Sequence, residues 1–263
     1  MAPKDVTVDD PINDKPMPLM EHIVELRRRL LWSAAAFLIA FFVCYHFSGA
    51  IFSFLAQPLA NILIHKSGAD RHLIFTALYE AFFTYIRVGV FGAAFISFPI
   101  IAIQVWLFVA PGLYRSEKRA LLPFLAATPV LFLMGAALAY YFVFPTAWRF
   151  FLSFETPTGG GGLPVQLDAK VSEYLNLVMK LIFAFGVAFQ LPVALSLLAK
   201  VGIVSSAGLK RFRRYAVVVM FVIAAILTPP DIITQSVLAV ALMALYEVSI
   251  ICARLVEPKP VDI

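Results

Sequence analysis

The sequence predicts an all-α membrane protein with six transmembrane helices. Hydrophobic residues make up 62% of its 263 residues and charged residues only 14%, whereas a soluble protein is about 45–50% apolar and about 25% charged. The apolar residues gather in six long runs, each followed by charged residues, glycine or proline. The Lys and Arg residues are divided unevenly between the connections. These three observations favour lipid over a large soluble core as the surroundings of the chain.

The chain divides into one membrane domain with a short tail at each end. Residues 1–19 are polar, acidic and proline-containing, without the apolar segment of a signal peptide, and predict a disordered cytoplasmic tail. Residues 20–255 are expected to form a single six-helix transmembrane domain. Residues 256–263 are expected to form a second cytoplasmic tail.

The first three predicted helices are long. Leu30–Phe47 follows an amphipathic turn over residues 20–29, and Ala81–Ala110 carries one charged residue. Between Arg119 and Arg149 no residue is charged, so the third helix lies in this interval. Each of these runs has the 17 or more residues that a membrane crossing needs, roughly.

The last three predicted helices are Tyr174–Ala199, Tyr215–Leu227 and Ile232–Cys252, and the last two are short. Arg214 and Asp231 are 17 positions apart, which corresponds to a helix of about 26 Å at about 1.5 Å per residue. A hydrocarbon core is about 30 Å thick. The bilayer is therefore expected to thin at these helices, or flanking side chains to reach its surface.

Prolines interrupt several of these runs. Pro99, Pro123, Pro129 and Pro192 each remove a backbone hydrogen bond and predict a kink. Several proline-kinked helices side by side would form a curved wall. A further amphipathic piece, residues 51–63, lies in the connection after the first helix and is broken at Pro58.

The positive residues predict the orientation. Fifteen of the 21 Lys and Arg residues lie before the first helix, after the second, after the fourth or after the sixth. Because positive residues stay on the cytoplasmic side, both termini are predicted to be cytoplasmic. The chain is therefore expected to cross a membrane several times, with both ends on the cytoplasmic side.

Two glutamates stand inside basic clusters on this predicted cytoplasmic side. Glu25 lies beside three consecutive arginines, and Glu117 lies between basic residues in the connection after the second helix. Their shared face and depth suit a partner carrying an arginine pair, since guanidinium groups bind carboxylates in a bidentate way and lysine does not.

Each glutamate also has a local explanation. Arg28 and Arg29 follow Glu25 by three and four positions, which is the spacing of helical ion pairs. Glu117 can neutralise the basic residues of its own loop, Arg115, Lys118 and Arg119. Spacing alone favours the local explanation for both.

Three further residues have alternative interpretations. Gln190 lies deep in the fourth run, where an amide usually forms a hydrogen bond between helices. It cannot titrate, so it is not a proton carrier. Arg87 and Lys180 lie inside the outer ends of their helices, where long side chains reach toward the membrane surface.

Catalysis has little support in the sequence. The four histidines, His22, His46, His65 and His72, show no metal-ligand spacing, and no hydrolase or phosphate-loop motif is present. No enzyme activity, metal, cofactor or nucleic acid is expected. A secondary transporter of a small solute is the alternative function, although it would need polar groups at the membrane midplane beyond Gln190. A membrane scaffold without a ligand is a third class.

Four sequence blocks, which lie within the interval from about residue 18 to residue 255, resemble the TatC family, the largest subunit of the twin-arginine protein translocase. The blocks are HIVELRRRL (22–30), QVWLFVAPGLYRSEKR (104–119), FGVAFQLP (185–192) and LTPPDIITQ (227–235). They occur in the family's order.

The resemblance implies a function. The family binds the twin-arginine motif in signal peptides of folded cargo, recruits small single-helix subunits of the TatA and TatB type, and uses the proton-motive force. It also implies self-association in a larger complex and a location in a bacterial inner membrane. The implied signal-peptide site comprises Glu25, Arg27, Leu113, Tyr114 and Glu117.

The resemblance also marks residues for structure or partner contact. These are Pro58, Arg87, Pro99, Asp231 and Gln235. One position departs from the family pattern, because many members carry a glutamate where this chain has Gln190. An ionisable group at that position is therefore not required here, and Gln190 is expected to make polar contacts, including contacts with a partner helix.

Overall fold

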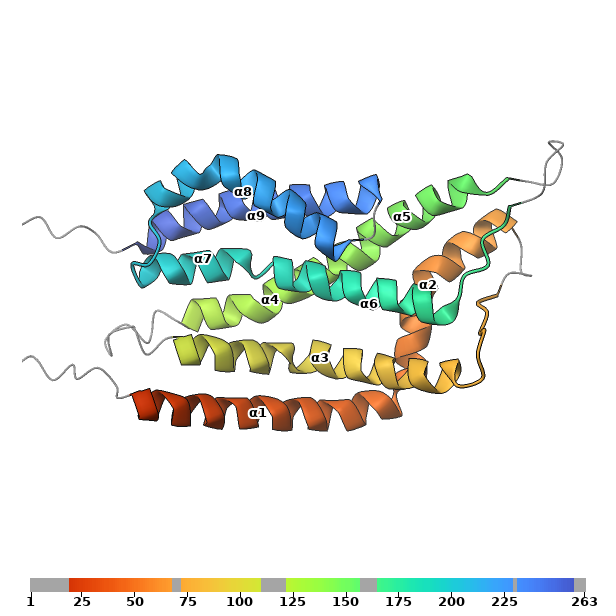
Figure 1. Ribbon diagram of the computed structural model, residues 1–263, viewed down its shortest axis with the longest axis horizontal. Coiled ribbons are helices and arrows are strands. Elements are labelled where there is room, and N and C mark those ends of the chain that lie inside the picture. The colour runs from red at the N-terminus through yellow and green to blue at the C-terminus, as the bar shows by residue number, and fades with distance from the viewer. Residues whose placement is uncertain (1–18, 68–71, 110–121, 157–164, 229–230, 258–263) are drawn as a thin grey trace, which may run out of the picture.

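The computed structural model describes residues 19–67, 72–109, 122–156, 165–228 and 231–257 (Figure 1). Its elements are α1 (Leu19–His46), α2 (Ser48–Ser67), α3 (Glu80–Val109), α4 (Leu122–Leu138), the π-helical turn η3 (Ala139–Val143), α5 (Phe144–Phe151), the 3-10 turn η4 (Leu152–Phe154), α6 (Val171–Ala188), α7 (Leu191–Lys200), α8 (Ser206–Leu227) and α9 (Ile232–Val256). Within these ranges the β pairing amounts to two isolated bridges. The predicted all-α fold is confirmed.

All six predicted apolar runs lie in helices. Five helical segments of the described chain are long and apolar enough to cross a membrane, and these are His22–His46, Glu80–Phe108, Pro123–Phe154, Val171–Lys200 and Ile232–Val256. The remaining run is the second part of α8, which follows the basic residues between Lys210 and Arg214. Most of the helices run along the long axis of the molecule, whereas α2 crosses it obliquely (Figure 1).

The helix ends that border the connections predicted to be cytoplasmic lie at one end of the molecule. Figure 1 shows the start of α1, the end of α3, the start of α4, the end of α7 and the end of α9 at that end. We call it the basic end, defined by Arg27–Arg29 of α1 and Lys210–Arg214 of α8. The opposite end, where α1 meets α2 and where α3 and α6 begin, is the far end.

The last two helices are longer than their apolar runs. α8 begins at Ser206, so the basic residues are helical as well, and α9 continues past Glu247 to Val256. Toward the far end, however, the α8–α9 hairpin stops before the end of α5 and the start of α6 (Figure 1). The additional helical residues therefore lengthen the hairpin at the basic end and not at the far end.

Prolines and irregular turns divide two of the predicted helices. Pro58, Pro99 and Pro129 lie inside α2, α3 and α4. The predicted kink at Pro123 is not required, because this residue lies in the first turn of α4, where the missing N–H has no helical partner. The predicted third helix contains the turn η3, and the predicted fourth helix is interrupted at Gln190, so α6 and α7 are separate.

Two helices approach each other closely in the middle of the molecule. α1 packs mainly on α3 and α8 mainly on α9, and these pairs lie at opposite edges (Figure 1). Between them, α4 and α6 approach so closely that a Cβ on Gly135 would lie 2.4 Å from the carbonyl oxygen of Phe185. Small residues allow such close approach of helices in membranes. The contact holds α4 close to α6 in the middle of the molecule.

Candidate functional site

A cavity of about 350 Å³ opens at the basic end between α1 and α3. The side chains of Glu25, Arg28, Arg29 and Trp32 line it from α1, and Gln104 lines it from α3. Charged groups of both signs therefore share this cavity with an aromatic ring. It contains one of the two glutamates that the sequence singled out.

Glu25 is held by an arginine of its own helix. The Arg29 Nε donates a hydrogen bond of 3.0 Å to Glu25 Oε1, and Arg29 Nη2 forms an ion pair with the same oxygen. Arg29 Nη1 also donates to Gln104 Oε1 at 3.3 Å, which links α1 to α3. The two charged side chains are 24% and 21% exposed. The helical ion pair expected from spacing is therefore present, and an amide 75 positions away shares it.

Gln104 is a member of this cavity that sequence reasoning did not single out. In the sequence it stands among apolar residues near the end of α3, but the sequence does not indicate which residue it contacts. A second contact joins the same two helices, because His22 stacks on Phe108 with ring centroids 4.3 Å apart. These contacts fix the position of Glu25 relative to the end of α3.

The remaining residues of the implied signal-peptide site are placed only in part. Arg27 is exposed on α1 and is not among the residues that line the cavity. Leu113, Tyr114 and Glu117 lie outside the described residues. The elements on either side of them, α3 and α4, end and begin at the basic end (Figure 1).

Gln190 lies between α6 and α7 and contacts a third helix. Its Nε2 donates a hydrogen bond of 3.0 Å to the carbonyl oxygen of Thr128 in α4, and the residue is 9% exposed. Its Oε1 is buried and has no hydrogen-bond partner among the described residues. The expected contact between helices is thus present, and one acceptor remains for a donor from elsewhere.

The residues marked for structure or partner contact are scattered. Arg87 is exposed on α3, Pro99 and Gln235 are half-buried, and Pro58 is buried. Asp231 has a definite local role as the N-cap of α9, where it accepts hydrogen bonds from the backbone N–H and the hydroxyl of Thr234. Such a cap stabilises the start of a helix.

Two further sets of polar contacts connect elements away from the basic end. Glu80, at the start of α3, accepts hydrogen bonds from the backbone N–H groups of Thr76 and Ser172 at 2.9 and 3.3 Å, and its carboxylate lies 3.9 Å from Lys170. Lys180 donates to the carbonyl oxygen of Ile226 at 3.3 Å, which links α6 to the end of α8.

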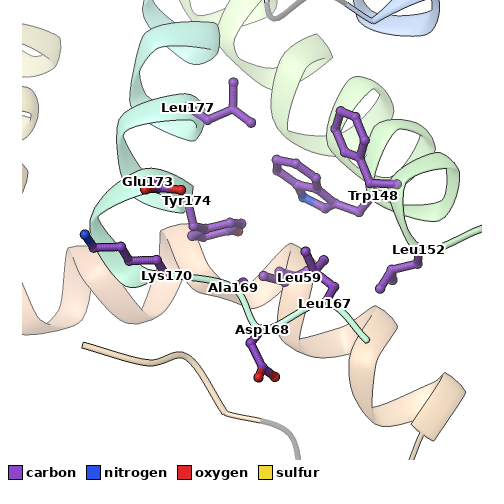
Figure 2. A pocket seen from close by; sticks show the side chains of 11 residues that line it. Leu59, Trp148, Leu152, Leu167, Asp168, Ala169, Lys170, Glu173, Tyr174 and Leu177 are labelled. Atoms are coloured by element: carbon purple, nitrogen blue, oxygen red, sulfur yellow. The ribbon is translucent and has the colours of Figure 1, made fainter. Parts of the chain in front are cut away.

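A second cavity, of about 230 Å³, lies between α2, α5 and α6. Figure 2 shows Leu59, Trp148 and Tyr174 around it, with the carboxylate of Asp168 pointing away. Tyr174 donates to the carbonyl oxygen of Leu55 at 2.8 Å, whereas the buried Nε1 of Trp148 has no acceptor among the described residues. No residue of this cavity also lines the cavity at Glu25.

Comparison with known proteins identifies the family. The family model described as "Sec-independent protein translocase protein (TatC)" matches residues 21–240. The TatC protein of Magnetococcus marinus is 52% identical over 242 residues, which cover 92% of this chain and 86% of that protein. The TatC protein of Rickettsia prowazekii is 48% identical over 244 residues, with 92% and 95% covered.

Solved structures give the same result. A crystal structure described as the twin-arginine translocase receptor TatC superposes with a TM-score of 0.72 at 36% identity, covering 89% of this chain and 99% of that chain. A second, described as that receptor in DDM, gives 0.74 at 38% identity, with 88% and 98% covered. This chain therefore belongs to the TatC family and is a multi-pass membrane component of the Sec-independent protein translocase, not an enzyme.

Proposed function

We propose that this chain binds the twin-arginine signal peptides of folded proteins at the basic end and recruits small single-helix subunits of the TatA and TatB type. Membership in a translocase family supports the proposal, as does the description of solved relatives as twin-arginine translocase receptors. The proposed location is a bacterial inner membrane with both termini in the cytoplasm, where cargo with such a signal is made.

The observation that carries the proposal is the surroundings of Glu25. Its carboxylate already binds one guanidinium, that of Arg29, within a cavity of about 350 Å³. A carboxylate offers about four acceptor positions, so an arginine from a peptide can bind beside Arg29. It can also displace Arg29, which then keeps its hydrogen bond to Gln104.

Glu117 is the proposed second acceptor. It belongs to residues 110–121, which join the end of α3 to the start of α4, and both of these lie at the same end as Glu25 (Figure 1). Arg27, Leu113 and Tyr114 are the proposed neighbours of the peptide. A charge-assisted hydrogen bond contributes about 1.5–3 kcal/mol when desolvated and under about 1 kcal/mol when exposed. Two such bonds give weak binding, so apolar contacts with the peptide must add to it.

Peptide binding to variants of the purified chain tests this proposal. We expect Glu25→Ala and Glu117→Ala each to weaken binding of a signal peptide that contains Arg-Arg, and the double variant to abolish most of it. Glu173→Ala is the matched control, because this glutamate is an exposed residue of α6 that lines the second cavity and not the cavity at Glu25. Unchanged affinity in the double variant would refute the assignment of these two glutamates.

A further inference from the structure

Six consecutive exposed residues at the start of α8 form a basic and aromatic surface. They are Lys210, Arg211, Phe212, Arg213, Arg214 and Tyr215, and all lie on the basic end. The proposed signal-peptide site uses none of them. They precede the apolar part of α8 directly, so they lie where the helix enters the membrane.

The helical pitch divides the arginines of this segment between two sides. Arg213 faces α9, where its Nη2 lies 2.7 Å from Glu247 Oε2. Two positions along the chain correspond to about 200° around a helix, so Arg211 points the opposite way. Arg214 is three positions from Arg211 and shares its side. One arginine of the segment is therefore neutralised within the protein, and the other two share a side that faces away from α9.

Arg211 and Arg214 line a cavity of about 460 Å³ together with Phe212 and Tyr215. The guanidinium carbon of Arg214 lies 4.8 Å from the centroid of the Tyr215 ring, which fixes its position by a cation–π contact. The rings of Phe212 and Tyr215 lie 6.0 Å apart. None of the described residues that line this cavity carries a carboxylate. It therefore presents two positive groups, set between aromatic rings, to an anion.

The surface next to this cavity is apolar and continues on the same side of α8. Val218, Val222 and Ile226 follow Arg211 by 7, 11 and 15 positions, a spacing that keeps them on one helical face. Their side chains are 62%, 52% and 68% exposed. A ligand with an anionic head and a long apolar chain would match the cavity and this stripe at once.

We propose that Arg211 and Arg214 bind the headgroup phosphate of an anionic phospholipid, with an acyl chain lying along Tyr215, Val218 and Val222. Guanidinium groups bind phosphate oxygens in a bidentate way, and basic segments next to a membrane helix attract anionic lipid. Free phosphate would use only the cavity and leave the apolar stripe uncovered. A partner's carboxylate would use the charges but not require a phosphate.

Lipid binding to the purified full-length chain in detergent tests the proposal, with phosphatidylglycerol and phosphatidylcholine compared by native mass spectrometry. We expect phosphatidylglycerol to bind more tightly, and Arg211→Gln/Arg214→Gln to weaken it roughly 10- to 30-fold, at about fivefold per lost charge near a membrane surface. Arg211→Lys/Arg214→Lys keeps the charges without the forked geometry and is expected to lose affinity only in part.

Arg213→Gln is the matched control for the single variants Arg211→Gln and Arg214→Gln, because each removes one charge from the same helix, and Arg213 lies on the side paired with Glu247. Arg213→Gln is expected to change lipid binding less than twofold, whereas each single variant should weaken it about fivefold. Circular dichroism establishes that each variant is folded, and the two single variants replace the double variant if it is not.

Three results would overturn the lipid assignment. A loss in Arg213→Gln equal to the loss in Arg211→Gln or Arg214→Gln would show that net charge alone attracts the lipid. Equal binding of phosphatidylcholine would exclude a site for anionic headgroups. Full competition by glycerol 3-phosphate at low concentration would indicate a site for free phosphate. Because no signal peptide is present, the outcome is independent of the proposed receptor function.

Discussion

At the residue scale, Glu25 illustrates how a local and a functional explanation can both hold. Its ion pair with Arg29 follows directly from the spacing of four positions and was predictable. The hydrogen bond from Arg29 to Gln104 was not, because the two residues are 75 positions apart and meet only when α1 packs on α3. The local pair thus keeps the carboxylate in a fixed position, and in the proposed function this carboxylate accepts a second guanidinium.

Gln190 supports a prediction about partner binding. Gln190→Leu removes the donor to the Thr128 carbonyl oxygen and the buried Oε1, which has no partner among the described residues. A hydrogen bond of this kind contributes about 1 kcal/mol or less in a membrane, so the fold should persist. We expect co-purification of single-helix subunits to fall while signal-peptide binding is unchanged.

The matched control for Gln190 is Ser196→Ala, which removes another buried polar group from α7 whose Oγ has no partner among the described residues. Its co-purification should match that of the unmodified chain. Normal subunit binding in Gln190→Leu would leave only the hydrogen bond between helices as the role of this residue.

Asp231 supports a prediction about stability. It caps α9 through Thr234, at the turn of the α8–α9 hairpin. Asp231→Ala should lower the free energy of unfolding by about 1 kcal/mol, whereas Asp231→Asn, which also caps helices well, should change it much less. Unfolding in mixed micelles, followed by circular dichroism, measures both. Equal destabilisation by the two substitutions would show that the residue acts through its charge and not as a cap.

At the element scale, the sequence located the helices better than it located their interruptions. The six apolar runs all lie in helices, because long uncharged stretches satisfy their backbone groups internally in lipid. The π-helical turn at Ala139–Val143 and the separation of α6 from α7 were not predicted in this form. Such breaks depend on packing between elements, and the hydropathy of a segment carries no information about that packing. The apolar run also does not predict that α8 begins at Ser206, because charged residues end an apolar span without ending the helix.

The close approach of α4 and α6 gives a prediction for this scale. Gly135→Ala places a Cβ 2.4 Å from a backbone oxygen of Phe185, so one helix must move. Overpacking of this kind costs typically about 1–3 kcal/mol, and unfolding in mixed micelles should show a loss in that range. Gly49→Ala is the control, because nothing lies within 4 Å of its added Cβ. Its stability should be unchanged or slightly higher, since alanine favours a helix.

At the scale of the whole molecule, the distribution of charge agrees with the arrangement of the helix ends. The helix ends that border the four segments rich in Lys and Arg lie together at the basic end, although these segments come from separate parts of the sequence (Figure 1). A polypeptide that alternates direction across a membrane produces this result. The alternative of a solute transporter finds no support in the family assignment, which is to a protein translocase.

Cysteine labelling tests the proposed orientation. Ala207 is exposed near the start of α8 at the basic end, and Ser153 is exposed in the turn after α5. In spheroplasts, a membrane-impermeant maleimide should label a cysteine at 153 and should label one at 207 only after the membrane is opened. The background for both is the chain with Cys44 and Cys252 replaced by serine. The reverse pattern would invert the orientation and place the Glu25 cavity outside the cell.

Photocrosslinking from the Glu25 cavity tests the central claim most directly. A photoreactive phenylalanine at position 32, where Trp32 lines that cavity, should crosslink a signal peptide that contains Arg-Arg and should do so much less with its Lys-Lys version. The same group at Phe151, which lines the second cavity, should not crosslink either peptide. Equal crosslinking of the Arg-Arg and Lys-Lys peptides at position 32, or none at that position, would contradict the claim that this cavity receives the twin-arginine motif.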